Sequence, residues 1–267
     1  DFSAGGNAGE HSKVNAPGRV TRGEESFLPQ QGLVAYYPME GNFNDVSGNG
    51  NNGTANGDAT TIAGKFGNTG SFDGTDDSLT YTNQVIPIGG KSISFWVNPN
   101  NVSNNPLILD NIGGASAKNG TSIQLLSSNK IVFGSNQGTS GTVRFALSSS
   151  SNIQLEEWQY ITAIWDGTTN TNAVKLYING VLDAQGTSAT TEINNATHNL
   201  VIGAFANGAV PKLSGFLDEV AIYSRALSAT EIKNIYNGGR NIAAASQFTI
   251  VDSGGSETLG NAESSTT

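Results

Sequence analysis

The sequence contains no cysteine among its 267 residues, which excludes a disulfide framework, a thiolate metal site and a thiol nucleophile. Charged residues make up only 13%, and 13 Lys and Arg stand against 22 Asp and Glu, for a formal net charge of −9. Because no basic cluster stands out, nucleic acid is not expected as a partner. No apolar run approaches the roughly 20 residues that cross a bilayer, so no membrane span is expected. This composition is typical of a secreted or surface-displayed microbial protein.

Catalytic motifs are also missing from the sequence. Both histidines are isolated, and no GxSxG or HExxH run occurs. Three adjacent acidic pairs would suit a glycosidase, which places two carboxylates across a cleft: Asp76-Asp77, Glu156-Glu157 and Asp218-Glu219. Neighbouring residues of a strand point to opposite faces, however, so none of these pairs can form that couple by itself. We therefore expect no catalytic residues, and predict that the protein is not an enzyme.

Glycine, asparagine, serine and threonine are abundant, with 34 glycines alone, and this suits short strands joined by tight turns. The clearest local signal is Asn179-Gly180 between KLYI and VLDA, which predicts a type I′ hairpin turn. About a dozen short strand-like runs and one short helix indicate an antiparallel two-sheet sandwich from about Leu33 to Tyr223.

The closing strand is predicted over Phe216 to Tyr223, where the residues alternate as in a half-buried strand. This alternation sets Asp218 on the same face as Val220 and Ile222. A carboxylate among apolar neighbours requires hydrogen-bond donors, a cation or a place just outside the sheet. Asp218 is therefore the residue of this strand that most needs an explanation.

A short helix is predicted directly after the closing strand. Ser228 and Glu231 have the spacing of a capping box, in which each side chain bonds the other residue's backbone N–H. The turn signal Asn237-Gly238-Gly239 is expected to end the helix after Tyr236, and a brief extension of the helix over residues 241–245 is the alternative. We expect this helix, residues 228–236, to pack outside the sandwich.

The stretch GFLDEVAIYSRALSATEI resembles the closing strand and helix of LamG-like domains, the laminin-G-type jelly rolls of the concanavalin A-like lectin/glucanase superfamily. Further stretches fit in the family's order: GLVAYYPMEGNFNDVSGNGNNGT (32–54), GSFDGTDDSLTY (70–81), SISFWVNP (92–99), and EWQYITAIWDG (157–167) followed by VKLYINGVL (174–182). The resemblance covers about residues 32–239. It implies an all-β, antiparallel two-sheet jelly-roll sandwich at 32–240 with one short C-terminal helix. The change in composition outside this stretch indicates extended arms at 1–31 and 241–267. The resemblance also implies that the opening strand lies beside the closing strand.

The resemblance further implies a structural calcium ion where the opening loop meets the closing strand. Asp45 and Asp218 would supply side-chain ligands, and carbonyls near residues 48–51 would complete the shell, because calcium prefers six to eight oxygens. The alternative has no metal: Asp45 forms an Asx-turn and Asp218 accepts loop N–H groups. A second acidic group, Asp73, Asp76 and Asp77, is a weaker metal candidate that fits turn residues better.

Sugar sites in folds of this kind use aromatic residues on the concave sheet or at loop tips. Trp96 and Tyr177 lie opposite to the apolar face of their strands, so both are candidates to line a sugar-binding groove. The alternative is that another segment covers them, because family members carry aromatic residues at matching places for packing.

The two arms provide the candidates for assembly. Phe248 and Ile250 belong to a plausible strand, SQFTIVD, and Phe27 and Leu28 precede the sandwich. A strand supplied by a neighbouring copy satisfies the exposed edge of a sheet, and a contact that does not close on itself builds a filament. The alternative is that an arm folds back on its own domain.

We therefore predict a non-catalytic, adhesive subunit of a cell-surface polymer whose main partner is another copy of itself. The first alternative is a monomeric carbohydrate-binding module of a larger secreted protein, with surface glycans as partners. The second is a divergent glycoside hydrolase, which would need two carboxylates facing each other across the concave sheet.

Overall fold

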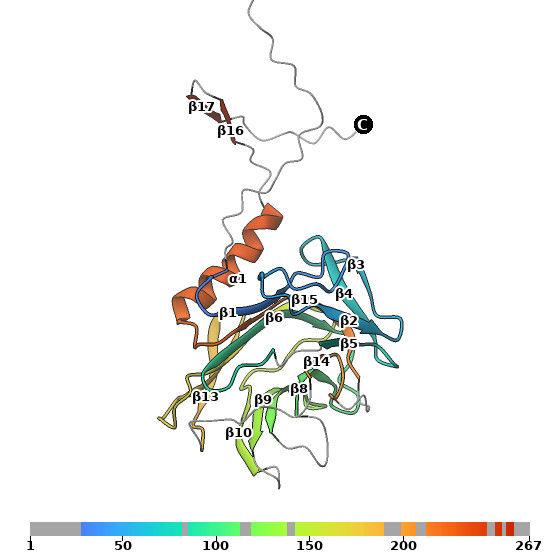
Figure 1. The fold of residues 1–267 in the computed structure, drawn as a ribbon, viewed down its shortest axis with the longest axis vertical. Coiled ribbons are helices and arrows are strands. Elements are labelled where there is room, and N and C mark those ends of the chain that lie inside the picture. The colour runs from blue at the N-terminus through green and yellow to red at the C-terminus, as the bar shows by residue number, and fades with distance from the viewer. Residues whose placement is uncertain are drawn as a thin grey trace, which may run out of the picture.

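The computed structural model describes residues 28–81, 85–112, 119–137, 142–189, 199–206, 212–244, 249–252 and 255–258. Its main body consists of two antiparallel sheets (Figure 1). The first has the order β13 (Val181–Gly186), β12 (Val174–Ile178), β11 (Gln159–Trp165), β6 (Lys91–Pro99), β15 (Ser214–Tyr223), β4 (Asn68–Asp73) and β3 (Thr60–Ala63), with β1 (Leu33–Tyr37) also paired to β15. The second has the order β10 (Thr142–Ser148), β9 (Ile131–Gln137), β8 (Gly120–Leu125), β7 (Leu107–Asp110), β14 (Val201–Ile202), β5 (Ser78–Tyr81) and β2 (Gly53–Asn56).

This architecture confirms the predicted all-β jelly-roll sandwich. The opening strand β1 pairs with the closing strand β15, as the family resemblance implied. The Asn179-Gly180 turn is confirmed as well, since both residues have positive φ angles, 51° and 78°. A separate two-stranded hairpin, β16 (Thr249–Asp252) and β17 (Gly255–Thr258), pairs only within itself among the described strands.

The core between the two sheets comes from alternate residues of each strand. In β6, Ile93, Phe95 and Val97 point inward, where they join apolar side chains of the second sheet such as Ile123 and Phe133. Each such side chain contributes about 1.5–3 kcal/mol on burial. Strand β11 is buried along its whole length and β6 at every residue except Asn98, so their outward-facing residues must be covered too.

The cover is helix α1 (Ala229–Ala244), which lies on the outer side of the first sheet (Figure 1). The predicted capping box is confirmed: the Glu231 N–H donates to Ser228 Oγ at 3.2 Å, and the Ser228 N–H donates to Glu231 Oε2 at 2.8 Å. The helix end predicted after Tyr236 is wrong, because α1 continues through Gly238 and Gly239 to Ala244, as in the alternative with an extension. Glycine costs a helix only about 1 kcal/mol relative to alanine, and the residues after it suit a helix.

A β-bulge in β15 corrects the predicted orientation of Asp218. Asp218 pairs with Trp96 but Ala221 pairs with Ser94, so β15 has one more residue than β6 in this interval. The additional residue is Glu219, whose φ is 55°. Asp218 therefore points to the outer side of the first sheet with Trp96, while Val220 and Ile222 point into the core between the sheets.

The described part of the N-terminal arm packs on its own domain. Leu28 is 3% exposed and belongs to the cluster under α1, which corresponds to the alternative in which the arm folds back. Phe27 and Phe248 lie outside the described residues, and Ile250 lies in β16. The boundary predicted at residue 240 falls within α1.

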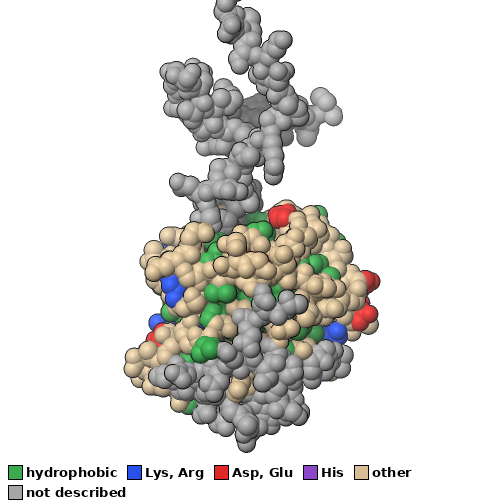
Figure 2. All heavy atoms as spheres, in the orientation of Figure 1, with side chains coloured by type: hydrophobic (Ala, Val, Ile, Leu, Met, Phe, Trp, Pro, Cys, Tyr) green, Lys and Arg blue, Asp and Glu red, His purple; other side chains and the backbone are tan. Residues whose placement is uncertain are grey.

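On the face drawn in Figure 2, charged side chains are few and scattered, as expected for a chain with 13% charged residues. Among the described residues, no helix has the length and apolar character needed to span a membrane.

Candidate functional site

A groove of about 280 Å³ opens on the outer face of the second sheet. Strands β7, β8 and β9 form its floor, and the segment after β14 contributes Phe205. Its lining residues are Leu107, Asp110, Ile112, Ser122, Gln124, Asn136 and Phe205. The volume is close to the lower end of the range of about 300–1,000 Å³ that is usual for small-molecule sites.

Strand alternation explains why polar side chains line this groove. In β8, Ile123 and Leu125 are fully buried in the core between the sheets, so Ser122 and Gln124 point outward. Gly134 of β9 lies opposite Ser122 in the strand pairing. Because glycine has no side chain, Gly134 adds none beside Ser122.

Asp110 holds the walls of the groove in place. Its side chain is only 1% exposed. One carboxylate oxygen accepts a hydrogen bond from the Ile112 N–H at 3.1 Å, and the other accepts one from the Ala206 N–H at 2.8 Å. The same carboxylate therefore fixes the segments that follow β7 and β14, including the position of Phe205.

The remaining polar groups suit an uncharged, hydroxyl-rich ligand. Ser122 offers a hydroxyl, and Gln124 and Asn136 offer amides that both donate and accept hydrogen bonds. The Gln124 amide nitrogen already donates to the Asn105 carbonyl at 2.9 Å, which orients its oxygen. Phe205 is half-buried and adds an aromatic wall.

Trp96 and Tyr177, the aromatic residues predicted to line a sugar-binding groove, do not form an open surface. Trp96 is 3% exposed and Tyr177 is 7% exposed, both in the cluster under α1. The indole of Trp96 stacks on Tyr236 of α1, with ring centroids 5.5 Å apart and an interplanar angle of 26°. The structure corresponds to the alternative in which another segment covers these side chains, and that segment is α1, so the sugar-binding prediction for the two residues is corrected.

Asp45 makes the hydrogen bonds expected for the alternative in which it forms an Asx-turn and binds no metal. Its Oδ1 accepts from the N–H groups of Tyr36 (3.0 Å) and Ser47 (2.8 Å), and its Oδ2 accepts from Asn51 at 3.0 Å. Burial acts to raise the pKa of Asp45, but these hydrogen bonds outweigh it and leave the pKa below its usual value.

Asp218 is fully buried, and its Oδ2 accepts a hydrogen bond from the Phe66 N–H at 3.1 Å. Its Oδ1 has no hydrogen-bond partner among the described residues. Burial, with the negative charge of Glu219 as a second cause, raises the pKa of Asp218 to about 8.

The two carboxylates face different surroundings. The charge of Asp45 lies near enough to interact with Tyr37 and Tyr81, which belong to the core between the sheets. Asp218 instead accepts a hydrogen bond from Phe66, which belongs to the cluster under α1. Each carboxylate also has its own backbone donors. A calcium ion held by Asp45 and Asp218 stays a prediction.

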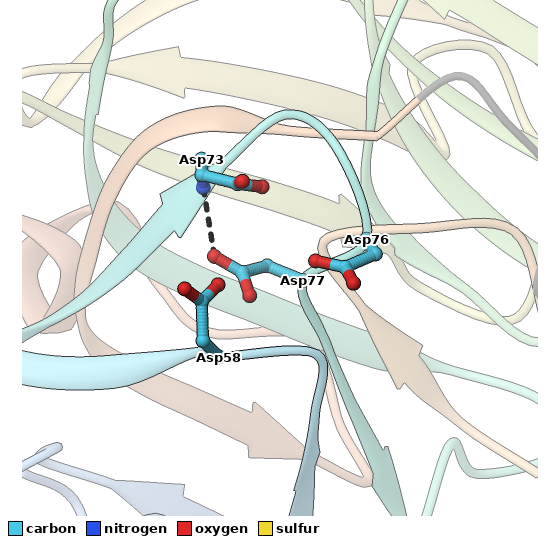
Figure 3. Close-up of side chains that lie close together, drawn as sticks. All are labelled: Asp58, Asp73, Asp76 and Asp77. Atoms are coloured by element: carbon cyan, nitrogen blue, oxygen red, sulfur yellow. Dashed lines mark hydrogen bonds between the residues drawn. The ribbon is translucent and has the colours of Figure 1, made fainter.

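A second acidic group is assembled by the fold. Asp58, Asp73, Asp76 and Asp77 each offer a carboxylate oxygen, and these atoms lie within 4.8 Å of one another (Figure 3). The Asp73 N–H donates to Asp77 Oδ2 at 2.8 Å, and the Thr75 N–H donates to Asp73 Oδ1 at 2.6 Å. Asp73, Asp76 and Asp77 thus occupy a turn, as expected. Asp58 comes from a different turn, and its place in this group was not predicted.

The groove residues were also missed. The alternation in TSIQL distinguishes outward Ser122 and Gln124 from inward Ile123 and Leu125, so this signal was present in the sequence. That Ser122 and Gln124 lie close to Asp110, Asn136 and Phe205, however, depends on the order of strands in the sheet.

The comparisons with known proteins agree with this fold. A family model described as the concanavalin A-like lectin/glucanases superfamily matches residues 73–233. Domain 4 of AbnA, an extracellular arabinanase from Geobacillus stearothermophilus in complex with arabinotriose, superposes with a TM-score of 0.55 at 23% identity, covering 76% of this chain and 98% of that domain. No curated protein matches the sequence.

Toxin binding domains share the fold over about half of their length. The binding domain of Paraclostridial Mosquitocidal Protein 1 has a TM-score of 0.60 at 19% identity, covering 78% of this chain and 52% of that one. The binding domain of Botulinum neurotoxin DC in complex with SialylT has a TM-score of 0.59 at 18% identity, covering 79% of this chain and 52% of that one. At these identities the similarity establishes the fold.

Proposed function

Because the chain belongs to the concanavalin A-like lectin/glucanases superfamily, we propose that it is a non-catalytic carbohydrate-binding module whose glycan lies in the β7–β9 groove. The observation that carries this proposal is the set of outward-facing Ser122, Gln124 and Asn136 beside the half-buried ring of Phe205. A sugar offers hydroxyls to amides and apolar C–H surface to an aromatic ring, so this set matches its chemistry.

Two proteins of the same fold support the choice of ligand class. The arabinanase domain is in complex with arabinotriose, and the neurotoxin DC binding domain is in complex with SialylT. Both ligands belong to the arabinanase domain and the neurotoxin domain themselves. For this chain they favour carbohydrate as the first ligand class to test, and they favour a role outside the cell.

Binding without hydrolysis is the simpler proposal for this groove. A glycoside hydrolase requires two carboxyl groups about 5–10 Å apart across the scissile bond. Asp110 is the one carboxylate among the described lining residues, and both of its oxygens already accept backbone hydrogen bonds. It acts as a positioning residue for the groove walls.

A glycan array followed by titration calorimetry tests the proposal. Gln124→Ala and Asn136→Ala are each expected to weaken binding about 2- to 10-fold, because losing one neutral hydrogen bond costs about 0.5–1.5 kcal/mol. Gln185→Ala is the matched control, since Gln185 is an exposed glutamine on β13 of the other sheet. If no glycan binds, or if both groove variants bind as tightly as the control, the proposal is wrong.

The second proposal is that the chain is an adhesive subunit of a cell-surface polymer. The β16–β17 hairpin supports it, because an isolated two-stranded hairpin is marginally stable and would gain from pairing with a sheet edge of another copy. Deletion of residues 245–267 leaves α1 intact and should reduce the mass measured by light scattering. A chain that is monomeric before deletion would contradict this role.

A further inference from the structure

Two connections between the sheets lie side by side at one edge of the sandwich. The turn from β2 to β3 runs from the second sheet to the first and carries Asp58. The turn from β4 to β5 runs in the opposite direction and carries Asp73, Asp76 and Asp77. Because β2 pairs with β5 and β3 pairs with β4, both turns must cross at the same place.

The two turns are in direct contact. Gly57, next to Asp58, has a φ of 69°, and a Cβ atom on it would lie 2.8 Å from the Oδ1 and carbonyl oxygen of Asp76. Glycine therefore allows the close approach that brings Asp58 to the carboxylates of the other turn. The fold thus holds four acidic side chains together that mutual repulsion would separate.

Asp77 supplies an independent observation. Its side chain is 2% exposed, and its Oδ1 has no hydrogen-bond partner among the described residues. Figure 3 shows the carboxyl group of Asp77 between those of Asp58 and Asp76, with its other oxygen held by the Asp73 N–H. Carboxylates only accept hydrogen bonds, so a buried carboxylate oxygen facing other carboxylates requires a cation or a proton.

The nearby lysine does not fill this role by hydrogen bonding. Lys212 donates from Nζ to the backbone carbonyl oxygen of Asp76 at 2.9 Å, which is not a carboxylate oxygen. Its charge lies at the rim of the β4–β5 turn. Within the part of the chain that the structure describes, Lys212 forms no ion pair with these carboxylates, so it does not neutralise the acidic group by direct contact.

We propose that Asp58, Asp73, Asp76 and Asp77 bind one calcium ion that ties the two crossing turns together. Calcium is the cation of choice because all of the ligands are oxygens, because its coordination is flexible, and because water fills the positions that the protein leaves open. The site is separate from Asp45 and Asp218, and the inference does not depend on glycan binding in the groove.

Thermal unfolding of the metal-free protein, with and without millimolar calcium chloride, tests this site. Calcium is expected to raise the melting temperature by about 5 °C or more if its concentration reaches 100 times the dissociation constant. Titration calorimetry should give one calcium per chain, and magnesium chloride should have a smaller effect. The double variant Asp58→Asn with Asp76→Asn changes two exposed side chains and should remove most of the calcium response.

Two control measurements distinguish calcium binding at this site from a general effect of surface charge. Glu157→Gln removes an exposed charge elsewhere and should keep the full calcium response. The metal-free double variant should melt at or above the melting temperature of the metal-free parent, because it has lost repulsion and not a structural contact. A parent that does not respond to calcium shows that a proton fills the site and overturns the proposal. A response that survives in the double variant, or that Asp218→Asn abolishes, also overturns it.

Discussion

The two outer faces of the sandwich differ in what their strands present. The outer face of the first sheet carries Trp96, Tyr160 and Tyr177, and α1 covers it. The outer face of the second sheet carries Ser122 and Gln124 and opens as a groove. An antiparallel sheet can leave one face in water only where that face is polar. The outward residues of each sheet therefore decide which face needs another layer and which can receive a ligand.

The largest expected effect comes from removing the centre of the covered face. Trp96→Ala should lower the free energy of unfolding by about 3–5 kcal/mol, because the indole packs between Phe66, Tyr160 and Tyr236. Urea denaturation measures this loss. Trp158→Ala is the matched control: Trp158 is half-buried and its ring lies 6.4 Å from that of Phe216, so its loss should be smaller. Equal losses would mean that α1 does not protect Trp96 as described.

The buried Asp218 on the same face should make stability depend on pH. Its folded pKa of about 8 lies above the ordinary value of 3.8, so between these values the folded state holds a proton that the unfolded state has released. Stability should therefore fall as pH rises through this window and level off above about pH 8. Asp218→Asn lacks this group, so the difference in stability between variant and parent should shift in favour of the variant as pH rises.

Urea denaturation of both proteins at a series of pH values measures this difference, in which other titrating groups largely cancel. A difference that stays constant from pH 4 to pH 8, within about 0.5 kcal/mol, would show that Asp218 is ionised throughout this range. A bound cation or additional donors would then be required beside it.

Local signals in the sequence were sufficient for part of this structure. The capping box of Ser228 and Glu231 and the Asn179-Gly180 turn each depend on a few consecutive residues, and both are present as predicted. The bulge at Glu219 was not predicted, because alternation assumes that neither strand has an additional residue. One residue in β15 was enough to place Asp218 on the opposite face.

The candidate sites were harder to predict because both combine distant segments. The groove joins β7, β8 and β9 to Phe205, and the acidic group joins Asp58 to a turn that begins 15 residues later, at Asp73. Sequence patterns show which way a side chain points from its own strand. They do not show which strand lies next to it, and the covering of Trp96 and Tyr177 by α1 was left open for the same reason.

The smallest expected effect on stability lies in the open groove. Asn136 is only half-buried, so Asn136→Ala should change the free energy of unfolding by no more than about 0.5 kcal/mol. The same substitution should weaken glycan binding, because the amide would contact the ligand and not the core. Urea denaturation and calorimetry on one preparation measure both quantities. Trp96→Ala should show the opposite pattern, with a large loss of stability and no direct effect on the groove. If Asn136→Ala instead lowers the free energy of unfolding by several kcal/mol, the groove side chains support the fold and the two faces do not differ as proposed.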